Sequence, residues 1–224
     1  MHNETGFDEM RFVRQIRYHR LGAIGQQKLS EAHAAIVGCG ALGSTTAMSL
    51  TRAGIGRLTI IDRDVPEWSN LPRQFLFTEK DVCDGLPKAI IAEKRLKEID
   101  RNVQVIPHVR DLSAHNISDL LSSVDVIVDG TDNFETRFLV NDFSCRENIP
   151  WVYGGVIGAE GRVMAVIPGT TACLRCLIPE PPAPGSLPTC DTAGVLGAAV
   201  MVVGGVQTSE TIKILVNAAP PTES

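Results

Sequence analysis

A glycine-rich turn is the first feature of the sequence with evident chemistry. Gly38, Gly40 and Gly43 follow a short apolar run, and helix-forming sequence comes directly after them. Glycines at this spacing permit a tight turn and let a phosphate approach the amide groups at the start of a helix. Asp62 lies about 20 residues further on, where an acidic side chain binds a ribose hydroxyl in nucleotide-binding folds. The pattern favours a nucleotide site, and glycines that serve only helix–strand packing are the alternative.

A second polar segment favours phosphoryl chemistry over hydride transfer. Asn70, Arg73 and Gln74 lie in an irregular stretch that leaves the end of the next apolar run, and Lys88 begins the following helix. In open α/β sheets this edge is where ligands bind. Two cations beside a phosphate-binding turn stabilise negative charge that grows on a phosphoryl group, whereas hydride transfer has no such need. Taken singly, each cation has an ordinary alternative as a solvated surface side chain.

The cysteines are informative through their spacing rather than their number. Cys173 and Cys176 form a CxxC pair, the spacing of half a tetrahedral zinc site. Cys190 lies just before a predicted helix, where a thiol can have a lowered pKa and act as a nucleophile. An unreactive loop thiol is the alternative for Cys190. The remaining cysteines are scattered and are expected to be buried thiols: Cys39, Cys83 and Cys145.

The elements that must position these residues alternate between strands and helices. Predicted strands lie at 34–37, 58–62, 103–106 and 124–128, and predicted helices at 44–53, 87–99, 113–121 and 133–147. Such alternation specifies a Rossmann-like α/β fold, with a doubly wound, mostly parallel sheet and helices on both faces. Asp132 comes directly before the last of these helices and, with Glu135, resembles a capping box.

The two ends of the chain add to this core. Apolar residues at helical spacing predict one or two amphipathic N-terminal helices within residues 1–30. Beyond Pro150, two strands at 151–156 and 162–167 are expected to extend the sheet.

A proline-rich crossover loop at 168–190 carries the CxxC pair and is expected to be mobile. A long helix should follow it, capped by Asp191 or Thr192, running to Val216 and buried on most sides. No linker interrupts the chain, so residues 1–224 are interpreted as a single domain.

Length and composition fit this interpretation. The 224 residues can bury a full core, and 21 Lys and Arg against 26 Asp and Glu give a formal net charge of −5. This balance argues against a broad nucleic-acid-binding surface. The longest nearly uncharged run is shorter than the roughly 20 residues that a membrane-spanning helix needs, and no signal peptide is evident. We expect a cytoplasmic protein without a membrane partner.

Several short motifs follow one another in a fixed order along nearly the whole chain. They are Arg14-Gln15, Gly38 to Gly43, Asp62 to Asp64, Ser69 to Gln74, Gly85 to Lys88, Asp129 to Asn133, Cys173 to Leu177, and Cys190 with Gly194 and Val195. In this order, and with its Ser-Asn-Leu-x-Arg-Gln and Thr-Asp-Asn signatures, the chain resembles the MoeB/ThiF/HesA family. These are adenylyltransferases that activate ubiquitin-like sulfur carriers and are related to ubiquitin-activating enzymes.

The resemblance implies a defined reaction. In it, the C-terminal Gly-Gly carboxylate of a carrier attacks the α-phosphorus of Mg·ATP, giving an acyl-adenylate and pyrophosphate for sulfur transfer in molybdopterin or thiamine biosynthesis. The family pattern implies the following roles: Asp62 binds the ribose, Asn70, Arg73 and Lys88 contact the phosphates beside Gln74, and Asp132 lies by Mg²⁺ and the reacting phosphate.

The resemblance also implies a homodimer, because Arg14 in such enzymes reaches the nucleotide of the partner subunit. A sulfur donor protein would be a further partner. A carboxylate that attacks a phosphate brings two anions together, so cations such as Arg14 are expected to screen the repulsion. Asp132 has an alternative as a plain helix N-cap, and Asp129 is either a secondary candidate or a residue that simply ends its strand.

In the family, a second CxxC pair near the C-terminus completes the zinc site begun by Cys173 and Cys176. No cysteine follows Cys190 here, and a structural zinc needs four ligands. The site is then empty or completed from another chain, and without zinc the loop around Cys173 should be poorly ordered. Cys190 occupies the place of a family cysteine that in some members forms a covalent link to the carrier.

Two other functions stay open at the level of sequence. The glycine turn and Asp62 alone also fit a nicotinamide-dependent oxidoreductase, but the candidate acid/base residues His108 and His115 have no recognisable partner. A non-catalytic member that binds carrier or nucleotide without turnover is the third interpretation, and the intact charged positions argue against it.

Overall fold

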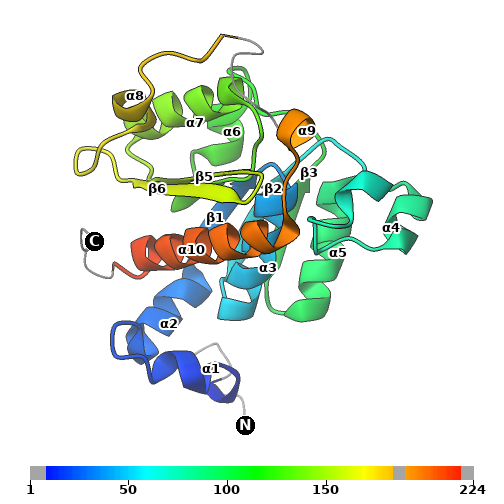
Figure 1. The fold of residues 1–224 in the computed structure, drawn as a ribbon. Helices are drawn as coiled ribbons and strands as arrows, with labels where there is room; N and C mark the ends of the chain where they lie inside the picture. Colours follow the sequence, from blue (N-terminus) through cyan, green and yellow to red (C-terminus); the bar gives the residue numbers. More distant parts are fainter. Residues whose placement is uncertain (1–8, 184–189, 218–224) are drawn as a thin grey trace.

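One six-stranded sheet forms the centre of the molecule (Figure 1). The computed structural model describes residues 9–183 and 190–217. The strands are β1 (His33–Val37), β2 (Arg57–Ile61), β3 (Gln104–His108), β4 (Val126–Asp129), β5 (Trp151–Ile157) and β6 (Glu160–Val166). They are ordered β3-β2-β1-β4-β5-β6, parallel except for the antiparallel pair β5–β6. The connections reverse direction between β1 and β4, so a topological switch point lies there.

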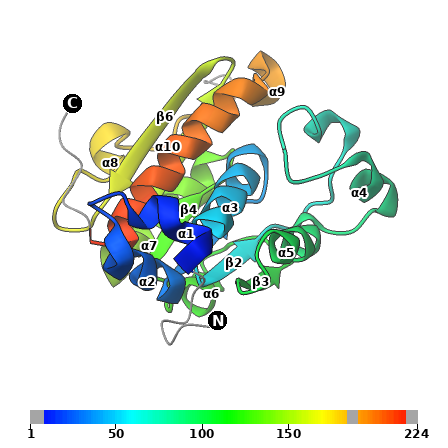
Figure 2. The ribbon, with the colours of Figure 1, turned by 90° about the horizontal axis from the view of Figure 1, so that it is seen from below.

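Helices cover both faces of the sheet, which confirms the predicted fold class (Figures 1 and 2). The helices are α3 (Ala41–Ala53), α5 (Lys88–Ile99) and α10 (Gly197–Leu215) on one face, and α6 (Ile117–Leu121), α7 (Phe134–Glu147) and α8 (Leu174–Leu177) on the other. Strand β1 is buried throughout, with Ile36 in the first core cluster and Val37 in the second. A strand buried on both faces is apolar along its whole length, which is why the sequence reveals it.

Two N-terminal helices, α1 (Glu9–Ile16) and α2 (Gly22–Glu31), confirm the predicted extension. They pack at the C-terminal end of α3. Gln15 Nε2 donates to the carbonyl oxygen of Ala53 at 2.9 Å and to Gln26 Oε1 at 2.7 Å. Gly54 ends α3 with φ +89°, and the ring of Phe12 fills the space that a Cβ there would occupy. The N-terminal helices are therefore anchored at the end of α3 that is remote from the glycine turn.

The segment between β2 and α5 is more ordered than its prolines predict. It contains a short 3-10 helix, η1 (Trp68–Asn70), and the helix α4 (Glu79–Asp84). Thr78 and Asp81 form a capping box at the start of α4. Both elements are shorter than two turns, so they carry no apolar periodicity that the sequence could reveal.

The N-cap of α7 differs from the prediction. Asn133 is the cap, and its Oδ1 accepts a hydrogen bond from the amide of Thr136 at 2.8 Å. Asp132 is therefore not the cap, and the predicted capping box with Glu135 is wrong. Asn and Asp cap helices about equally well, so the tertiary structure of the preceding turn decides between two adjacent candidates.

The predicted C-terminal helix is divided in two. A short α9 (Cys190–Ala193) is followed by Gly194 with φ +73°, and Leu196 is the N-cap of α10. The amide of Gly158, in the β5–β6 turn, donates to Gly194 O at 2.8 Å, and its carbonyl accepts from the Leu196 amide at 2.8 Å. A single helix capped by Asp191 or Thr192 is thus wrong, because the backbone pairs with the hairpin instead.

Helix α10 is also less buried than predicted. It packs on α3, β5 and β6 with one face, while Met201 and Val202 are 54% and 68% exposed on another. The expectation of burial on most sides is therefore wrong. Within residues 9–183 and 190–217, no helix is both long and apolar enough to cross a bilayer.

Candidate functional site

The glycine turn joins β1 to α3 at the switch point, where the prediction places a phosphate. Gly38 has φ +85°. A Cβ on Gly43 would lie 1.8 Å from Gly38 O, and one on Gly130 would lie 2.1 Å from the same atom. Close packing of the backbone therefore leaves no room for a side chain at Gly43 or Gly130, whether or not a ligand binds there. Gly40 is different: the nearest atom to a Cβ there is Gln74 Nε2, at 3.7 Å, so its missing side chain widens the site rather than relieving a clash.

Asp62 ties the end of β2 to this turn. Its Oδ2 accepts a hydrogen bond from the amide of Cys39 at 2.7 Å, and its Oδ1 accepts from the amide of Asp64 at 2.8 Å. Burial raises the pKa of Asp62, and the two amide hydrogen bonds offset only part of that effect. Each carboxylate oxygen has a second lone pair available for a ligand hydroxyl.

A cavity of about 290 Å³ lies beside the turn and brings together five of the predicted site residues: Asn70, Arg73, Gln74, Lys88 and Asp132. It is lined by Asp64, Val65, Glu67, Asn70, Arg73, Gln74, Lys88 and Asp132. These residues come from the segment between β2 and η1, from η1 and the turn after it, from the start of α5, and from the loop that follows β4. Its volume is close to the lower limit of ligand pockets, about 300 Å³. The cavity therefore suits a compact group, with the rest of a larger ligand lying outside it.

The cavity contains a buried cation. The side chain of Lys88 is only 7% exposed, and its Nζ lies 3.5 Å from Asp64 Oδ2. The amide of Lys88 also donates to Asp64 O at 2.7 Å, which fixes the start of α5 against the end of β2. Arg73 is half-buried, and its Nη1 donates to Ser69 O at 2.6 Å. Because these cations are already held by the protein, little reorganisation is needed to meet an anion.

Gln74 provides an independent sign of a missing ligand. It is buried, yet its Oε1 has no hydrogen-bond partner among the described residues. A buried acceptor without a partner destabilises a protein by about 1–3 kcal/mol. Such an atom at the wall of a polar cavity fits a site that a ligand donor completes.

Among the predicted catalytic residues, Arg14 is not brought to the cavity. Arg14 is exposed on α1, which packs at the end of α3 that is remote from the glycine turn. The 13 residues of α3 span about 20 Å. In both ribbon views α1 lies apart from α4, which follows the cavity segment (Figures 1 and 2). The backbone of Cys190 lies in α9, which contacts β5, and its side chain lies outside the described residues.

The CxxC pair does not form a complete metal site. Cys173 Sγ and Cys176 Sγ are 3.8 Å apart, and the part of the chain that the structure describes contains no group of three or more potential metal ligands. Within the described residues, the pair therefore supplies only two of the four ligands of a structural zinc site. Of the three scattered cysteines, Cys39 is buried as expected, whereas Cys83 and Cys145 are exposed, so that expectation is wrong for both.

Helix α8, which has Cys173 as its N-cap and contains Cys176, is held by α7. Arg175 donates to both carboxylate oxygens of Asp142, at 2.7 and 2.6 Å, and the amide of Leu174 donates to Asn141 Oδ1 at 2.8 Å. The hydrogen bonds from Arg175 lower the pKa of Asp142. The segment around Cys173 thus has anchors that need no metal. Residues 184–189 lie outside the described residues, and mobility of the loop stays a prediction.

Sequence reasoning missed a polar network behind the cavity. Asp129, at the end of β4, is buried with Arg137 of α7, whose Nε lies 3.0 Å from Asp129 Oδ2. Gln207 of α10 is fully buried and donates to Asp129 O at 2.7 Å and to Val152 O at 3.0 Å. The sequence gives only a weak signal for it: Gln207 directly follows the apolar run that ends at Val206, within the same predicted helix.

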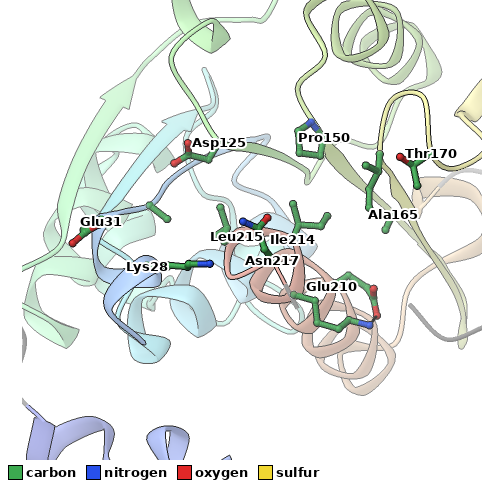
Figure 3. A pocket seen from close by; sticks show the side chains of 13 residues that line it. Lys28, Glu31, Asp125, Pro150, Ala165, Thr170, Glu210, Ile214, Leu215 and Asn217 are labelled. Atoms are coloured by element: carbon green, nitrogen blue, oxygen red, sulfur yellow. Dashed lines mark ion pairs between the residues drawn. The ribbon is translucent and has the colours of Figure 1, made fainter. Parts of the chain in front are cut away.

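A larger cavity, of about 790 Å³, lies at the opposite end of the sheet. Figure 3 shows side chains of α2, α10 and β6 around it. Ala32, Asp125 and Pro150, which also line it, directly precede β1, β4 and β5. Ligands of open α/β sheets bind at the carboxyl ends of strands, and this cavity lies at the amino ends. The smaller, cation-lined cavity is therefore the candidate site.

Known proteins share both the sequence and the fold. The chain is 47% identical over 205 residues to the sulfur carrier protein ThiS adenylyltransferase of Bacillus subtilis, covering 92% of this chain and 60% of that protein. It is 39% identical to a sulfur carrier protein adenylyltransferase of Thermus thermophilus, covering 94% of this chain and 79% of that protein. A crystal structure of E. coli MccB with ATP matches with a TM-score of 0.82 at 23% identity, over 98% of this chain and 67% of that one, which shows the fold alone.

The family model described as the ThiF family matches residues 12–224, a range that includes the glycine turn, the cavity and the CxxC pair. The motif order, the reversal of the sheet at β1 and β4, and this match agree. The chain belongs to the ThiF family.

Proposed function

We propose that this chain is an ATP-dependent adenylyltransferase that activates the C-terminal Gly-Gly carboxylate of a ubiquitin-like sulfur carrier. The observation that carries the proposal is the cavity beside the glycine turn, where Arg73, Lys88 and Asp132 meet. The names of the relatives from Bacillus and Thermus support the substrate, and the ATP complex of MccB supports the nucleotide.

The cavity suits an attack of one anion on another. A carrier carboxylate oxygen would form a bond to the α-phosphorus of ATP while the bond to the pyrophosphate oxygen breaks. Both reactants are negatively charged, and charge grows on the departing pyrophosphate. Lys88 supplies a buried positive charge, Arg73 supplies a second, and Asn70 and Gln74 add polar groups on the same wall. Asp62 would receive the ribose.

Asp132 fits a role as a magnesium ligand. Its carboxylate is exposed, lines the cavity and does not cap α7. Mg²⁺ prefers oxygen ligands and is bound by one or two carboxylates together with substrate phosphates. When bound, the ion neutralises phosphate charge, and Asp132 would hold it in the cavity.

The proposal extends to the assembly. Because Arg14 is remote from the cavity of its own chain, it would act in a homodimer, at the nucleotide of the partner subunit. Cys190 would act after activation: its thiolate would attack the carbonyl carbon of the acyl-adenylate, forming a thioester with the carrier and releasing AMP. A sulfur donor protein would be a further partner. The cytoplasm is the compartment predicted from the sequence for this reaction.

Carrier-dependent exchange of pyrophosphate into ATP tests the activity directly. Wild-type protein is expected to support exchange only with a carrier that ends in Gly-Gly, and Arg73→Ala is expected to reduce the rate by roughly 10²-fold or more. Arg52→Ala is the matched control, because Arg52 is an exposed arginine of α3 that does not line the cavity. No exchange with any Gly-Gly carrier, or full activity of Arg73→Ala, would refute the proposal.

Two binding measurements separate the alternatives. Tight carrier binding without pyrophosphate release would identify a non-catalytic carrier-binding protein. Stronger binding of a reduced nicotinamide cofactor than of ATP, measured by the fluorescence of the reduced nicotinamide, would identify an oxidoreductase.

A further inference from the structure

A buried ion pair lies behind the cavity, and none of the steps above uses it. Asp129 and Arg137 are 2% and 8% exposed, and Arg137 Nε lies 3.0 Å from Asp129 Oδ2. The guanidinium group is also enclosed by two aromatic rings, with the centroids of Phe134 and Tyr153 at 5.4 and 5.1 Å. Desolvation largely offsets the attraction in a buried ion pair, so a contribution to stability does not by itself explain the pair.

The pair holds the loop that carries Asp132. Asp129 Oδ1 accepts hydrogen bonds from the amide and the hydroxyl of Thr131, at 2.9 and 2.6 Å. Arg137 Nη2 donates to the carbonyl oxygen of Thr131 at 2.7 Å and to that of Gly154 at 3.1 Å. All three polar groups of Thr131 are therefore bound by the two members of the pair.

The residue on the other side of Asp132 is fixed as well. Asn133 caps α7 through the amide of Thr136, and Arg137 lies one turn further along the same helix. Asp132 is thus an exposed side chain between two residues whose backbone positions are set. The loop between β4 and α7 is only four residues long, so displacement of Thr131 moves Asp132 directly.

A second connection leads to the glycine turn. Gln207 Nε2 donates to Asp129 O at 2.7 Å, and Gln207 Oε1 accepts from Thr46 Oγ1 at 3.2 Å. Thr46 belongs to α3, the helix that begins at the glycine turn. One buried network therefore links the Asp132 loop to the helix expected to bind phosphate.

We propose that Asp129 and Arg137 are positioning residues that set Asp132 relative to the nucleotide. The proposal rests on the function proposed above, because it assigns the pair a role in that same site. A displacement of about 1 Å at a reacting group can reduce a rate roughly 10²-fold. The pair and the network behind it provide the rigidity that an exposed acidic side chain on a short loop does not have by itself.

Arg137→Lys is the informative variant. Lysine keeps the positive charge but replaces the planar fork with a single ammonium group, which does not reproduce the contacts of Nε and Nη2 together. The kcat of carrier-dependent exchange is expected to fall roughly 10- to 100-fold, with the KM for ATP within about threefold of wild type. Arg146→Lys is the matched control, because Arg146 is an exposed arginine of the same helix, paired with Glu147.

A double-mutant cycle with Asp132→Asn separates positioning from a merely structural role. If Arg137 acts through Asp132, Arg137→Lys changes kcat by less than about threefold in the Asp132→Asn background. An equal loss of kcat in both backgrounds, or a rise in the KM for ATP as large as the fall in kcat, would overturn the proposal.

A readout that needs no carrier distinguishes failure of this proposal from failure of the proposed function. If wild-type protein shows no exchange with any carrier, the function fails, and the positioning is then measured by hydrogen exchange of the amides of residues 130–134. Arg137→Lys is expected to raise exchange at the Thr131 amide at least roughly tenfold. Unchanged protection there overturns the positioning. Asp129→Asn takes the place of Arg137→Lys if the latter does not fold.

Discussion

Replacement of Gly43 by alanine tests the glycine turn most sharply. Gly43 lies in the first turn of α3, and a Cβ there would lie 1.8 Å from Gly38 O, 3.0 Å from Gly38 C and 3.1 Å from Ile36 Cγ2. The first two contacts are with backbone, which has no rotamer to change. The turn between β1 and α3 must therefore shift as a unit, and it carries the amides expected to bind phosphate.

The size of the effect follows from these distances. Gly38 O and the new Cβ must separate by more than about 1 Å before the contact becomes tolerable. A shift of that size in a binding turn corresponds to roughly 10²-fold in affinity or rate, or about 2.7 kcal/mol. The effect on stability should be smaller, because overpacking of about 1–3 kcal/mol is partly offset by the gain in helix propensity of about 1 kcal/mol.

The assay is a titration with ATP followed by tryptophan fluorescence. Trp68 lies in η1 beside the cavity and is 58% exposed, whereas the other tryptophan, Trp151, is fully buried. Gly205→Ala is the matched control: Gly205 also lies inside a helix, but nothing lies within 4 Å of a Cβ there. This control is expected to bind ATP normally and to be stabilised by up to about 1 kcal/mol.

Two results would refute the reasoning. Wild-type ATP affinity in Gly43→Ala would show that the turn does not bind the nucleotide or that it relaxes without displacement. Equal losses of affinity in Gly43→Ala and Gly205→Ala would show that the effect does not arise from the contact with Gly38.

Three further variants test other parts of the site. Gln74→Leu removes the buried acceptor that has no partner among the described residues. Without ATP, the variant should therefore unfold at an equal or higher temperature than wild type, while its affinity for ATP falls about tenfold. Unchanged ATP affinity would exclude a contact between Gln74 and the ligand. Lys88→Met should reduce the rate of pyrophosphate exchange by roughly 10²- to 10³-fold. The variant should still fold, because Asp64, the partner of Lys88, is exposed and stays hydrated. Near-normal exchange would contradict the role of this cation. Since hydrogen bonds from Arg175 lower the pKa of Asp142, the stability from this pair is present above the ordinary Asp pKa of about 4 and is lost as pH falls through the lowered value. Asp142→Asn should therefore reduce the free energy of unfolding by roughly 0.5 kcal/mol at pH 7 and not near pH 2; equal effects at both pH values in denaturant titrations would contradict this.

The sequence is sufficient to predict an element where the pattern is local, or where burial requires apolar residues throughout. Strand β1 is buried on both faces and is therefore apolar throughout. The glycines at 38 and 43 follow it at a spacing that only a tight turn before a helix explains, and the structure confirms the turn. Arg73 and Lys88 are predicted as cations near the phosphate-binding turn, and Asp132 is predicted through the family resemblance; all three line one cavity.

The predictions from sequence are wrong where two local conformations of the chain have nearly equal energies. Asp132 and Asn133 are both good N-caps, and the turn held by Asp129 decides for Asn133. The apolar run from 193 to 206 is compatible with one long helix, but hydrogen bonds to Gly158 in the β5–β6 turn interrupt it at Gly194. Such contacts join residues far apart in the chain, so no local pattern encodes them.

The sequence by itself thus determined the alternation of strands and helices, the glycine turn and the charged residues of the candidate site, because each depends on periodicity or on spacing along the chain. Only the tertiary structure decided that Gln74 keeps a buried acceptor with no partner in the described part of the chain, and that Arg137 and Gln207 hold the loop of Asp132. The physical reason is that hydrogen bonding of buried groups depends on what surrounds them in space. That environment is set by strands and helices that are distant in sequence and meet only when the sheet is assembled.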